Sequence, residues 1–202
     1  KLLVMDAFER IQDVPQWQLR FKLDDFSTLL DRAWEWARQS EANQELAGVE
    51  VPVGVHVSED VRIGGYMDRL LRDEKGNYLV VDLKTGRSTP AKKEGEEHVQ
   101  LMTYQLALAH GAFDGHQVHN GEGMPRKGGV LVYPGVTTKK IGEIWQSDKA
   151  PEALEEFAAL LPPLVEEMRG PRITARTNKD CDKCPIRSIC PVQEEGRMTT
   201  DA

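Results

Sequence analysis

Residues 49–57 place valine at every second position, which is the pattern of a β-strand with one buried face. Pro52 within this run predicts that the strand lies at the edge of its sheet, and His56 is expected to be an exposed strand residue. Two further strands are predicted over 61–71 and 78–84, joined by the turn sequence Asp73-Glu-Lys-Gly-Asn77. Any fold proposed for the chain must therefore contain an antiparallel hairpin over residues 61–84.

Helical spacing of apolar residues predicts helices on both sides of this region. A short helix over residues 3–11, which Pro15 ends, comes first. A long helix is then predicted to begin at Asp24 or Asp25 and to end near Leu46. The remaining elements are expected to be a polar loop over 85–96, a helix over 97–110, strands over 128–134 and 139–147, and a helix over 151–169 that Pro162-Pro163 breaks or kinks. This succession predicts a mixed α/β domain with a central sheet flanked by helices.

The composition is that of a globular protein. Charged residues make up 29% and apolar ones 40% of the 202 residues, and the formal net charge is -7. The chain is therefore not a histone-like basic binder, and contact with nucleic acid must come from local patches. No apolar run reaches the ~18 residues that a membrane span needs, so no membrane partner is expected. The absence of a secretory signal pattern predicts a cytoplasmic location.

The hairpin gathers charged residues that suit metal chemistry. Residues equally far from Lys75, at the centre of the turn, should oppose each other, so Asp68 should face Asp82. Lys84 lies on the same face because side chains alternate along a strand. Two carboxylates and one ammonium suit a divalent metal and a group that orients or deprotonates a water. The alternative is a hairpin with solvated charges on its outer face. The unalternating apolar run before Asp82 favours the first reading, because it predicts a strand covered on both sides.

Two polar residues on the following helix are candidates for the same site. Gln100 and Tyr104 are four residues apart and therefore share one helix face. They could hold a phosphate or an exposed base, and the alternative is an ordinary amphipathic helix with a polar stripe.

Three blocks of the sequence resemble the RecB-type branch of the PD-(D/E)XK nuclease superfamily, in the order that this family has. The blocks are Gly64-Gly-Tyr-Met-Asp68-Arg, Val80-Val-Asp82-Leu-Lys84-Thr-Gly86 and Gln100-Leu-Met-Thr-Tyr104-Gln-Leu-Ala. The resemblance covers about residues 50–110 and implies a restriction-endonuclease-like core that hydrolyses DNA phosphodiesters with a metal.

The resemblance also implies a role for each candidate residue. Asp68 and Asp82 would bind Mg²⁺ or Mn²⁺ together with the backbone carbonyl of Leu83. Lys84 would position or activate the attacking water, and the pair on the helix, Gln100 and Tyr104, would contact DNA or orient the site. Basic residues near the site or in the tail are expected to contact DNA, namely Arg87, Lys92, Lys93, Arg176 and Lys179.

The tail carries three cysteines, Cys181, Cys184 and Cys190, in a chain without a secretory signal, which favours metal ligation over disulfides. Their spacing resembles the C-terminal part of the iron–sulfur staple of AddB-type nucleases. Three thiolates cannot complete a four-cysteine 4Fe-4S site. The fourth cysteine of this family lies far upstream and is absent here. Either a longer parent protein would supply the missing ligand, or His or another group would substitute for it. A zinc site is the alternative, with His98, His110, His116 or His119 as the fourth ligand, and unligated cysteines are a third possibility.

Two departures from the RecB pattern concern the upstream region. RecB-type nucleases place a metal-binding His on a helix before the sheet, and no His precedes His56 here. The missing His and the missing Cys both belong upstream, which predicts that the chain is the C-terminal piece of a helicase–nuclease. Residues 1–175 would form the nuclease core and 176–202 the cysteine-bearing tail.

The resulting functional hypothesis is a RecB-like exonuclease domain that acts in DNA repair and recombination. Single-stranded DNA ends and a helicase domain or subunit are its expected partners. The alternatives are a catalytically inactive DNA-binding or scaffold domain, a stand-alone exonuclease related to the CRISPR adaptation nucleases, and a zinc-stapled interaction module.

Overall fold

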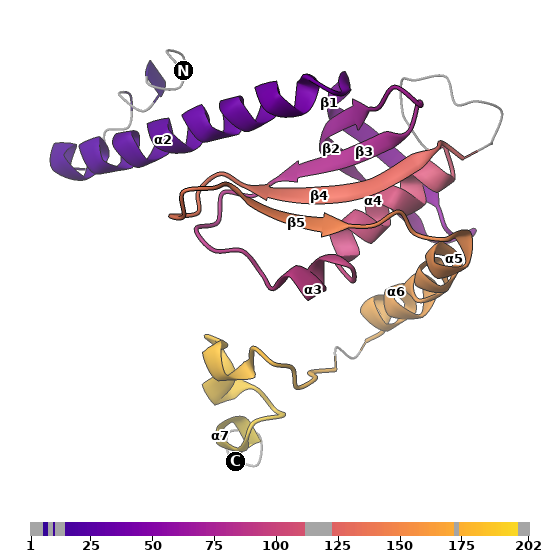
Figure 1. Cartoon of the computed structure of the whole chain (residues 1–202). Helices are drawn as coiled ribbons and strands as arrows, with labels where there is room; N and C mark the ends of the chain where they lie inside the picture. Colours follow the sequence, from indigo (N-terminus) through magenta and orange to yellow (C-terminus); the bar gives the residue numbers. More distant parts are fainter. Residues whose placement is uncertain (1–5, 8–9, 11–14, 112–122, 172–173, 198–202) are drawn as a thin grey trace. The chain divides into compact units, whose positions relative to one another are not determined.

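The computed structural model describes residues 6–7, 10, 15–111, 123–171 and 174–197 (Figure 1). It divides into two compact units, Lys1–Ala159 and Leu160–Ala202. The first unit holds the sheet and the second holds the cysteines.

The sheet has five strands in the order β1-β2-β3-β4-β5, so each strand pairs with its neighbours in sequence. All pairs are antiparallel except β3 with β4, which are parallel because helical segments connect them. The mixed α/β architecture with a central sheet is therefore confirmed. The strands are β1 (Glu45–His56), β2 (Arg62–Arg72), β3 (Tyr78–Leu83), β4 (Arg126–Tyr133) and β5 (Gly142–Gln146).

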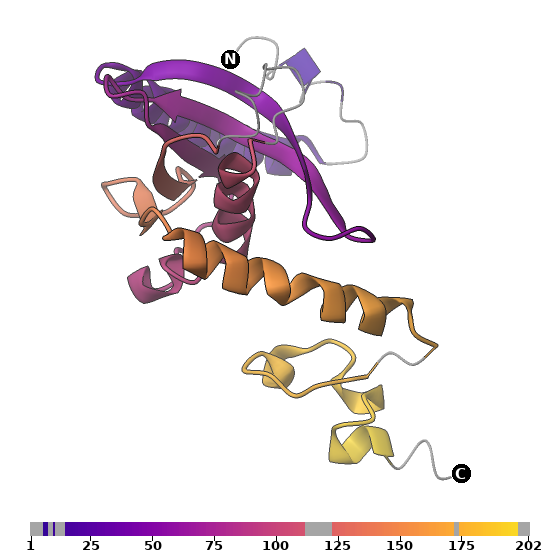
Figure 2. The same cartoon turned by 90° about the vertical axis from the view of Figure 1, so that its right-hand side faces the viewer.

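The two longest strands, β1 and β2, form a curved antiparallel ribbon (Figure 2). β1 is an edge strand, which confirms the position inferred from Pro52, and His56 is exposed as expected. The register of β2 with β3 is also as predicted. Arg69 pairs with Val81 and Arg72 with Tyr78, so the pairing is symmetric about Lys75.

Helices cover both faces of the sheet. On one face α4 (Val99–Ala109) packs Leu101, Tyr104 and Leu108 into a core with Val80. On the other face Trp36 of α2 (Gln16–Glu41) packs against a second cluster that contains Leu79 and Val81. Alternate residues of β3 thus enter different cores, which confirms that this strand is covered on both sides (Figure 1).

Helix boundaries are where the sequence-based expectations are wrong. α2 begins at Gln16, directly after Pro15, because the segment from there to Asp24 contains no residue that breaks a helix. It ends at Glu41, since β1 already begins at Glu45. The expected polar loop contains a short helix, α3 (Lys92–Gly95), and α4 begins at Val99. The short helix expected over 3–11 falls mostly outside the described residues.

The break or kink expected from Pro162-Pro163 within residues 151–169 is confirmed, because this segment forms two helices, α5 (Pro151–Ala159) and α6 (Leu161–Arg169). The break comes before the prolines, which occupy the first turn of α6, because Pro162 cannot donate a backbone hydrogen bond to the preceding turn. The second unit continues with two short 3-10 turns, η1 (Cys181–Lys183) and η2 (Arg187–Ile189), and the helix α7 (Glu194–Arg197).

Candidate active site

The carboxyl end of β3 brings the two predicted aspartates together. Asp82 is only 2% exposed, on the face of the sheet that α4 covers. Asp68 lies one residue beyond the Arg69–Val81 pair of β2 and β3, and its Oδ2 accepts a hydrogen bond of 2.7 Å from the backbone N–H of Leu83. This bond holds the Asp68 carboxylate beside the strand that carries Asp82.

Lys84 follows β3 directly and faces the same group. Its Nζ lies 2.6 Å from Asp82 Oδ2 in an ion pair and donates a hydrogen bond of 2.6 Å to Gln100 Oε1. The Lys84 side chain keeps 31% of its exposure whereas the Asp82 side chain keeps 3%. The ammonium is therefore the part of this pair that solvent, or a substrate, can reach.

The two polar residues of α4 join the same network. Gln100 Nε2 donates to Asp82 Oδ1 at 2.6 Å and to the Tyr104 hydroxyl at 2.9 Å. The Tyr104 hydroxyl in turn donates to the backbone oxygen of Tyr66 on β2, at 2.8 Å. Gln100 thus touches both the carboxylate and the ammonium, and the polar stripe on α4 faces the hairpin rather than solvent.

The charges of this site act on one another in a partly buried place. Burial raises the pKa of Asp82, the nearby Asp68 carboxylate adds to the rise, and the Lys84 ammonium opposes it. Burial likewise raises the pKa of Tyr104 and that of Tyr133 on β4, so both phenols stay protonated at neutral pH. Asp82 is therefore a buried carboxylate that Lys84 and Gln100 bind, and whose ionised form burial disfavours.

His98 belongs to this site, although the sequence analysis considered it only as a zinc ligand. It precedes α4, and its pKa is lowered by burial and by the charge of Lys84, while the charge of Asp82 opposes the shift. Its Nδ1 is buried without a hydrogen-bond partner in the described part of the chain. The sequence places His98 two residues before Gln100, which could have suggested that both belong to one site. Residues two apart on a helix point in different directions, however, so this spacing did not predict it.

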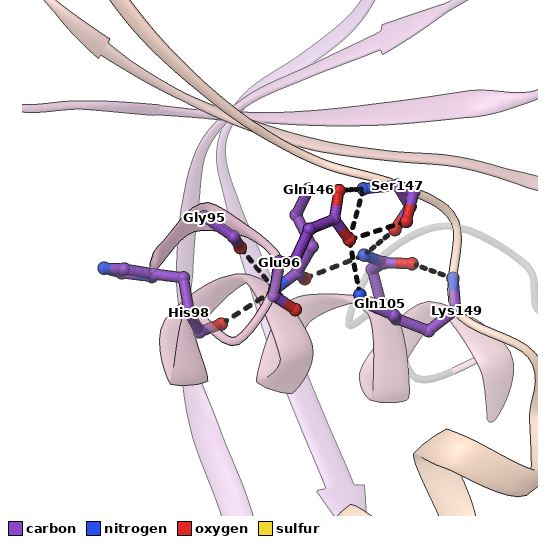
Figure 3. A network of polar contacts seen from close by, with 7 residues as sticks. All are labelled: Gly95, Glu96, His98, Gln105, Gln146, Ser147 and Lys149. Atoms are coloured by element: carbon purple, nitrogen blue, oxygen red, sulfur yellow. Dashed lines mark hydrogen bonds and ion pairs between the residues drawn. The ribbon is translucent and has the colours of Figure 1, made fainter. Parts of the chain in front are cut away.

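A buried pair of glutamines holds the segment that carries His98 (Figure 3). Gln146 of β5 is 1% exposed, and its Nε2 donates to the backbone oxygens of Gly95, Glu96 and His98 at 3.0, 3.2 and 3.1 Å. Gln105 of α4 is fully buried and donates to Gln146 Oε1 at 2.8 Å. We call Gln105 and Gln146 the glutamine clamp; it fixes the start of α4 and hence the position of Gln100.

The donor set of the site suits a hard divalent cation. Asp68 and Asp82 supply carboxylates, and Asp82 Oδ2 is paired with the Lys84 ammonium at 2.6 Å. Mg²⁺ and Mn²⁺ commonly take one or two carboxylates and complete their coordination with carbonyls, waters and phosphate oxygens. Within the described ranges no group of three or more His, Cys, Asp or Glu side chains is placed to hold a metal. The residues therefore fit a cation that shares its coordination with a substrate, rather than a cation enclosed by side chains.

The basic residues predicted to contact DNA lie in two places. Arg87 forms an ion pair with Asp25 of α2 in the first unit, and Lys92 and Lys93 are exposed on α3. Arg176 and Lys179 lie in the second unit, where Arg176 binds both carboxylate oxygens of Glu167 at 2.8 and 2.7 Å. Only the first three thus share a unit with the carboxylates.

The three cysteines are free thiols, each partly exposed. Cys181 Sγ accepts a hydrogen bond of 3.1 Å from the backbone of Asn178, and the 3-10 turns separate the three residues. The cysteine segment is among the described residues in which no three-ligand metal group is placed, so these side chains as they lie do not fit a cluster. Of the proposed zinc partners, His116 and His119 lie outside the described residues.

No helix among the described residues is both long and apolar enough to cross a membrane. The sequence model of the PD-(D/E)XK nuclease superfamily matches residues 2–191. No curated protein matches the chain. A solved structure described as "Crystal structure of SSO0001" is similar over 83% of this chain and 71% of that one, with 22% identity and a TM-score of 0.46. The family match spans nearly the whole sequence, and the chain therefore belongs to the PD-(D/E)XK nuclease superfamily.

Proposed function

We propose that the chain is a metal-dependent deoxyribonuclease whose active site consists of Asp68, Asp82, Lys84, Gln100 and Tyr104. Members of the superfamily are generally nucleases that use divalent metals. The observation that carries the proposal is the contact of Lys84 with both Asp82 and Gln100, at 2.6 Å in each case. An ammonium held beside a buried carboxylate, yet partly open to solvent, suits a phosphodiester that must approach acidic groups.

Each residue then has a task in hydrolysis. Asp68, Asp82 and the Leu83 carbonyl would hold Mg²⁺ or Mn²⁺, which supplies charge neutralisation at the phosphate when bound. Lys84 orients the attacking water and stabilises the negative charge that develops on the phosphate oxygens. Gln100 keeps Asp82 and Lys84 in one orientation, since its amide binds both, and Tyr104 anchors Gln100 to β2.

The finer part of the proposal is a RecB-like exonuclease that degrades single-stranded DNA ends during repair or recombination, in the cytoplasm, beside a helicase domain or subunit. The order and content of the three sequence blocks support this branch of the superfamily. The cysteine spacing supports an iron–sulfur staple, which would need a fourth ligand and a rearranged tail. A chain purified without oxygen that absorbs near 400 nm, and loses this band in Cys184→Ser, would support the staple.

The test of the nuclease is Mn²⁺-dependent cleavage of single-stranded DNA by the chain and by Lys84→Ala. We expect the substitution to lower kcat by about 100-fold or more, in the range for removing a group that transfers or orients protons. Lys75→Ala is the matched control, because Lys75 lies in the turn at the other end of β3 and is exposed. Linear and circular substrates, compared side by side, separate an exonuclease from an endonuclease.

Each result has a distinct meaning. Cleavage that survives in Lys84→Ala contradicts the assignment of Lys84. A chain that binds DNA but cleaves none, with Mg²⁺ or with Mn²⁺, supports the inactive DNA-binding domain instead. A chain that neither binds nor cleaves DNA but retains zinc supports the interaction module.

A further inference from the structure

A groove lies beside the candidate active site but on the other side of the end of β3. It has a volume of about 510 Å³ and is lined by α2 residues between Lys22 and Arg32, by Thr85 and Arg87, and by residues 134–137 after β4. Figure 1 shows α2 running along the end of β3 and the turn between β4 and β5. We call this cavity the α2 groove. It lies at the carboxyl ends of the parallel strands β3 and β4, where open α/β sheets commonly bind ligands.

The α2 groove has the chemistry of a nucleotide site. Phe26 contributes an aromatic ring to its lining, next to the apolar side chains of Leu29 and Val136. Three basic side chains, Lys22, Arg32 and Arg87, line it against a single acidic one. An aromatic and apolar floor with a basic rim suits single-stranded nucleic acid, since bases stack on the ring while phosphates meet the cations.

The wall of the groove is fixed by contacts within the first unit. The guanidinium of Arg32 donates to the backbone oxygen of Val136 and, at 2.9 Å, to that of Thr138, which ties α2 to the turn after β4. A preformed wall reduces the conformational entropy that the protein loses when a strand binds. The volume also lies within the range of small-ligand pockets, so the groove has room for a nucleotide.

We propose that the α2 groove binds the nucleotide next to the cleaved phosphodiester, so that a single DNA strand passes from Lys84 over Thr85 and along α2. This inference rests on the proposed function and extends it to the path of the substrate. Continuity supports it, because Thr85 lines the groove and directly follows Lys84 in the chain.

The ion pair between Arg87 and Asp25 acts as a competitor of the substrate in this groove. Both side chains are well exposed, at 69% and 61%, so their mutual attraction is weak and a phosphate can take the place of the carboxylate. Removing the Asp25 charge should therefore strengthen DNA binding, whereas removing a cation should weaken it.

The test measures binding and hydrolysis separately on the full chain. Fluorescence anisotropy of a labelled oligothymidylate in EDTA, over a range of KCl concentrations, gives the affinity of the wild type, Lys22→Ala, Asp25→Asn and Lys75→Ala. We expect Lys22→Ala to weaken binding by roughly tenfold and to reduce the salt slope by about 0.7, as for one lost phosphate contact on a single strand. Asp25→Asn should tighten binding by roughly threefold. Lys75→Ala makes the same change in net charge at the far end of the hairpin and is the matched control.

Hydrolysis assays in Mn²⁺ then show whether Lys22→Ala affects the α2 groove or the site at Lys84. Bis(4-nitrophenyl) phosphate is a phosphodiester without flanking nucleotides, so it reports the site at Lys84 alone. The ratio of kcat/KM on the oligonucleotide to that on this small substrate should fall about tenfold in Lys22→Ala. Equal weakening of binding by Lys22→Ala and Lys75→Ala, or weaker binding in Asp25→Asn, overturns the groove even if hydrolysis is intact. Absence of hydrolysis of both substrates by the wild type, with the expected binding changes present, overturns the nuclease and leaves the groove standing.

Discussion

At the scale of single residues, Asp82 makes the protein's stability depend on pH in an unusual direction. Burial raises its pKa in the folded chain, whereas the carboxyl of the unfolded chain ionises near pH 4. Between that pH and the raised pKa, the folded state binds more protons than the unfolded state. The free energy of unfolding contributed by Asp82 therefore falls as the pH rises through this window, the reverse of an ordinary ion-paired aspartate.

We predict that this loss is absent from Asp82→Asn. Urea denaturation in EDTA, from about pH 4 upwards, should show the wild type losing free energy of unfolding relative to Asp82→Asn as the pH increases. The difference should be constant above the folded-state pKa. A wild type that gains stability relative to the variant over this range would show that Lys84 outweighs burial.

The residues of the site were largely predictable, and His98 shows the limit. Asp68, Asp82 and Lys84 follow from symmetric pairing about a short turn, which is a local property of the sequence. Gln100 follows from helix periodicity. His98 precedes the helix, so no periodic pattern fixes the direction of its ring, and only the packing of α4 against β3 shows that it lies near Lys84.

At the scale of elements, the glutamine clamp connects β5 to the start of α4. Gln146→Leu would remove the amide that Gly95, Glu96 and His98 share. The oxygens of Gly95 and His98 would keep their backbone donors, the N–H groups of His98 and Met102, whereas that of Glu96 would lose the amide bond. We expect a loss of about 1–3 kcal/mol in the free energy of unfolding, because a buried acceptor without a partner is costly. We also expect a lower kcat with little change in KM for bis(4-nitrophenyl) phosphate, since Gln100 loses its fixed position. Urea denaturation and steady-state kinetics measure the two effects.

Gln39→Leu is the matched control for this prediction, because Gln39 is an exposed glutamine of α2 whose side chain donates to Glu35 of the same helix. It should change the free energy of unfolding by less than about 0.5 kcal/mol. A Gln146→Leu protein that matches the control in both stability and kcat would contradict the positioning role of the clamp.

The clamp also explains why elements were easier to predict than their boundaries. Strands and the β2–β3 register depend on alternation and on a turn, which are close in sequence. The start of α4 depends on an amide in β5, far along the chain, and the break between α5 and α6 depends on which carbonyl Pro162 would meet. The start of α4 is thus a property of the packed chain. The break at Pro162-Pro163 was predicted from the sequence, but its place before the prolines was not.

At the scale of the whole molecule, a metal that binds the folded state should stabilise the first unit. All four tryptophans of the chain lie between residues 17 and 145, so their fluorescence reports the unfolding of this unit alone. At a concentration of Mn²⁺ about 100 times its Kd, we expect a stabilisation of about 2.7 kcal/mol, which raises Tm by several degrees. The readout requires no catalysis.

Asp68→Asn and Asp82→Asn should each abolish most of this Mn²⁺-dependent rise in Tm, while Glu152→Gln, an exposed substitution on α5, should keep it. A rise that persists in both aspartate variants would place the metal elsewhere in the first unit.

The parallel pairing of β3 with β4 also sets an order for folding. The β2–β3 hairpin closes through a tight turn, whereas β4 must find β3 after α3 and α4 have intervened. Contacts between distant segments form late, so we expect the β2–β3 hairpin early and the docking of β4, with β5 beside it, onto β3 last. A nascent chain would then carry its carboxylates well before Gln146 fixes α4. Under the proposed function, hydrolysis would therefore begin only after this final step.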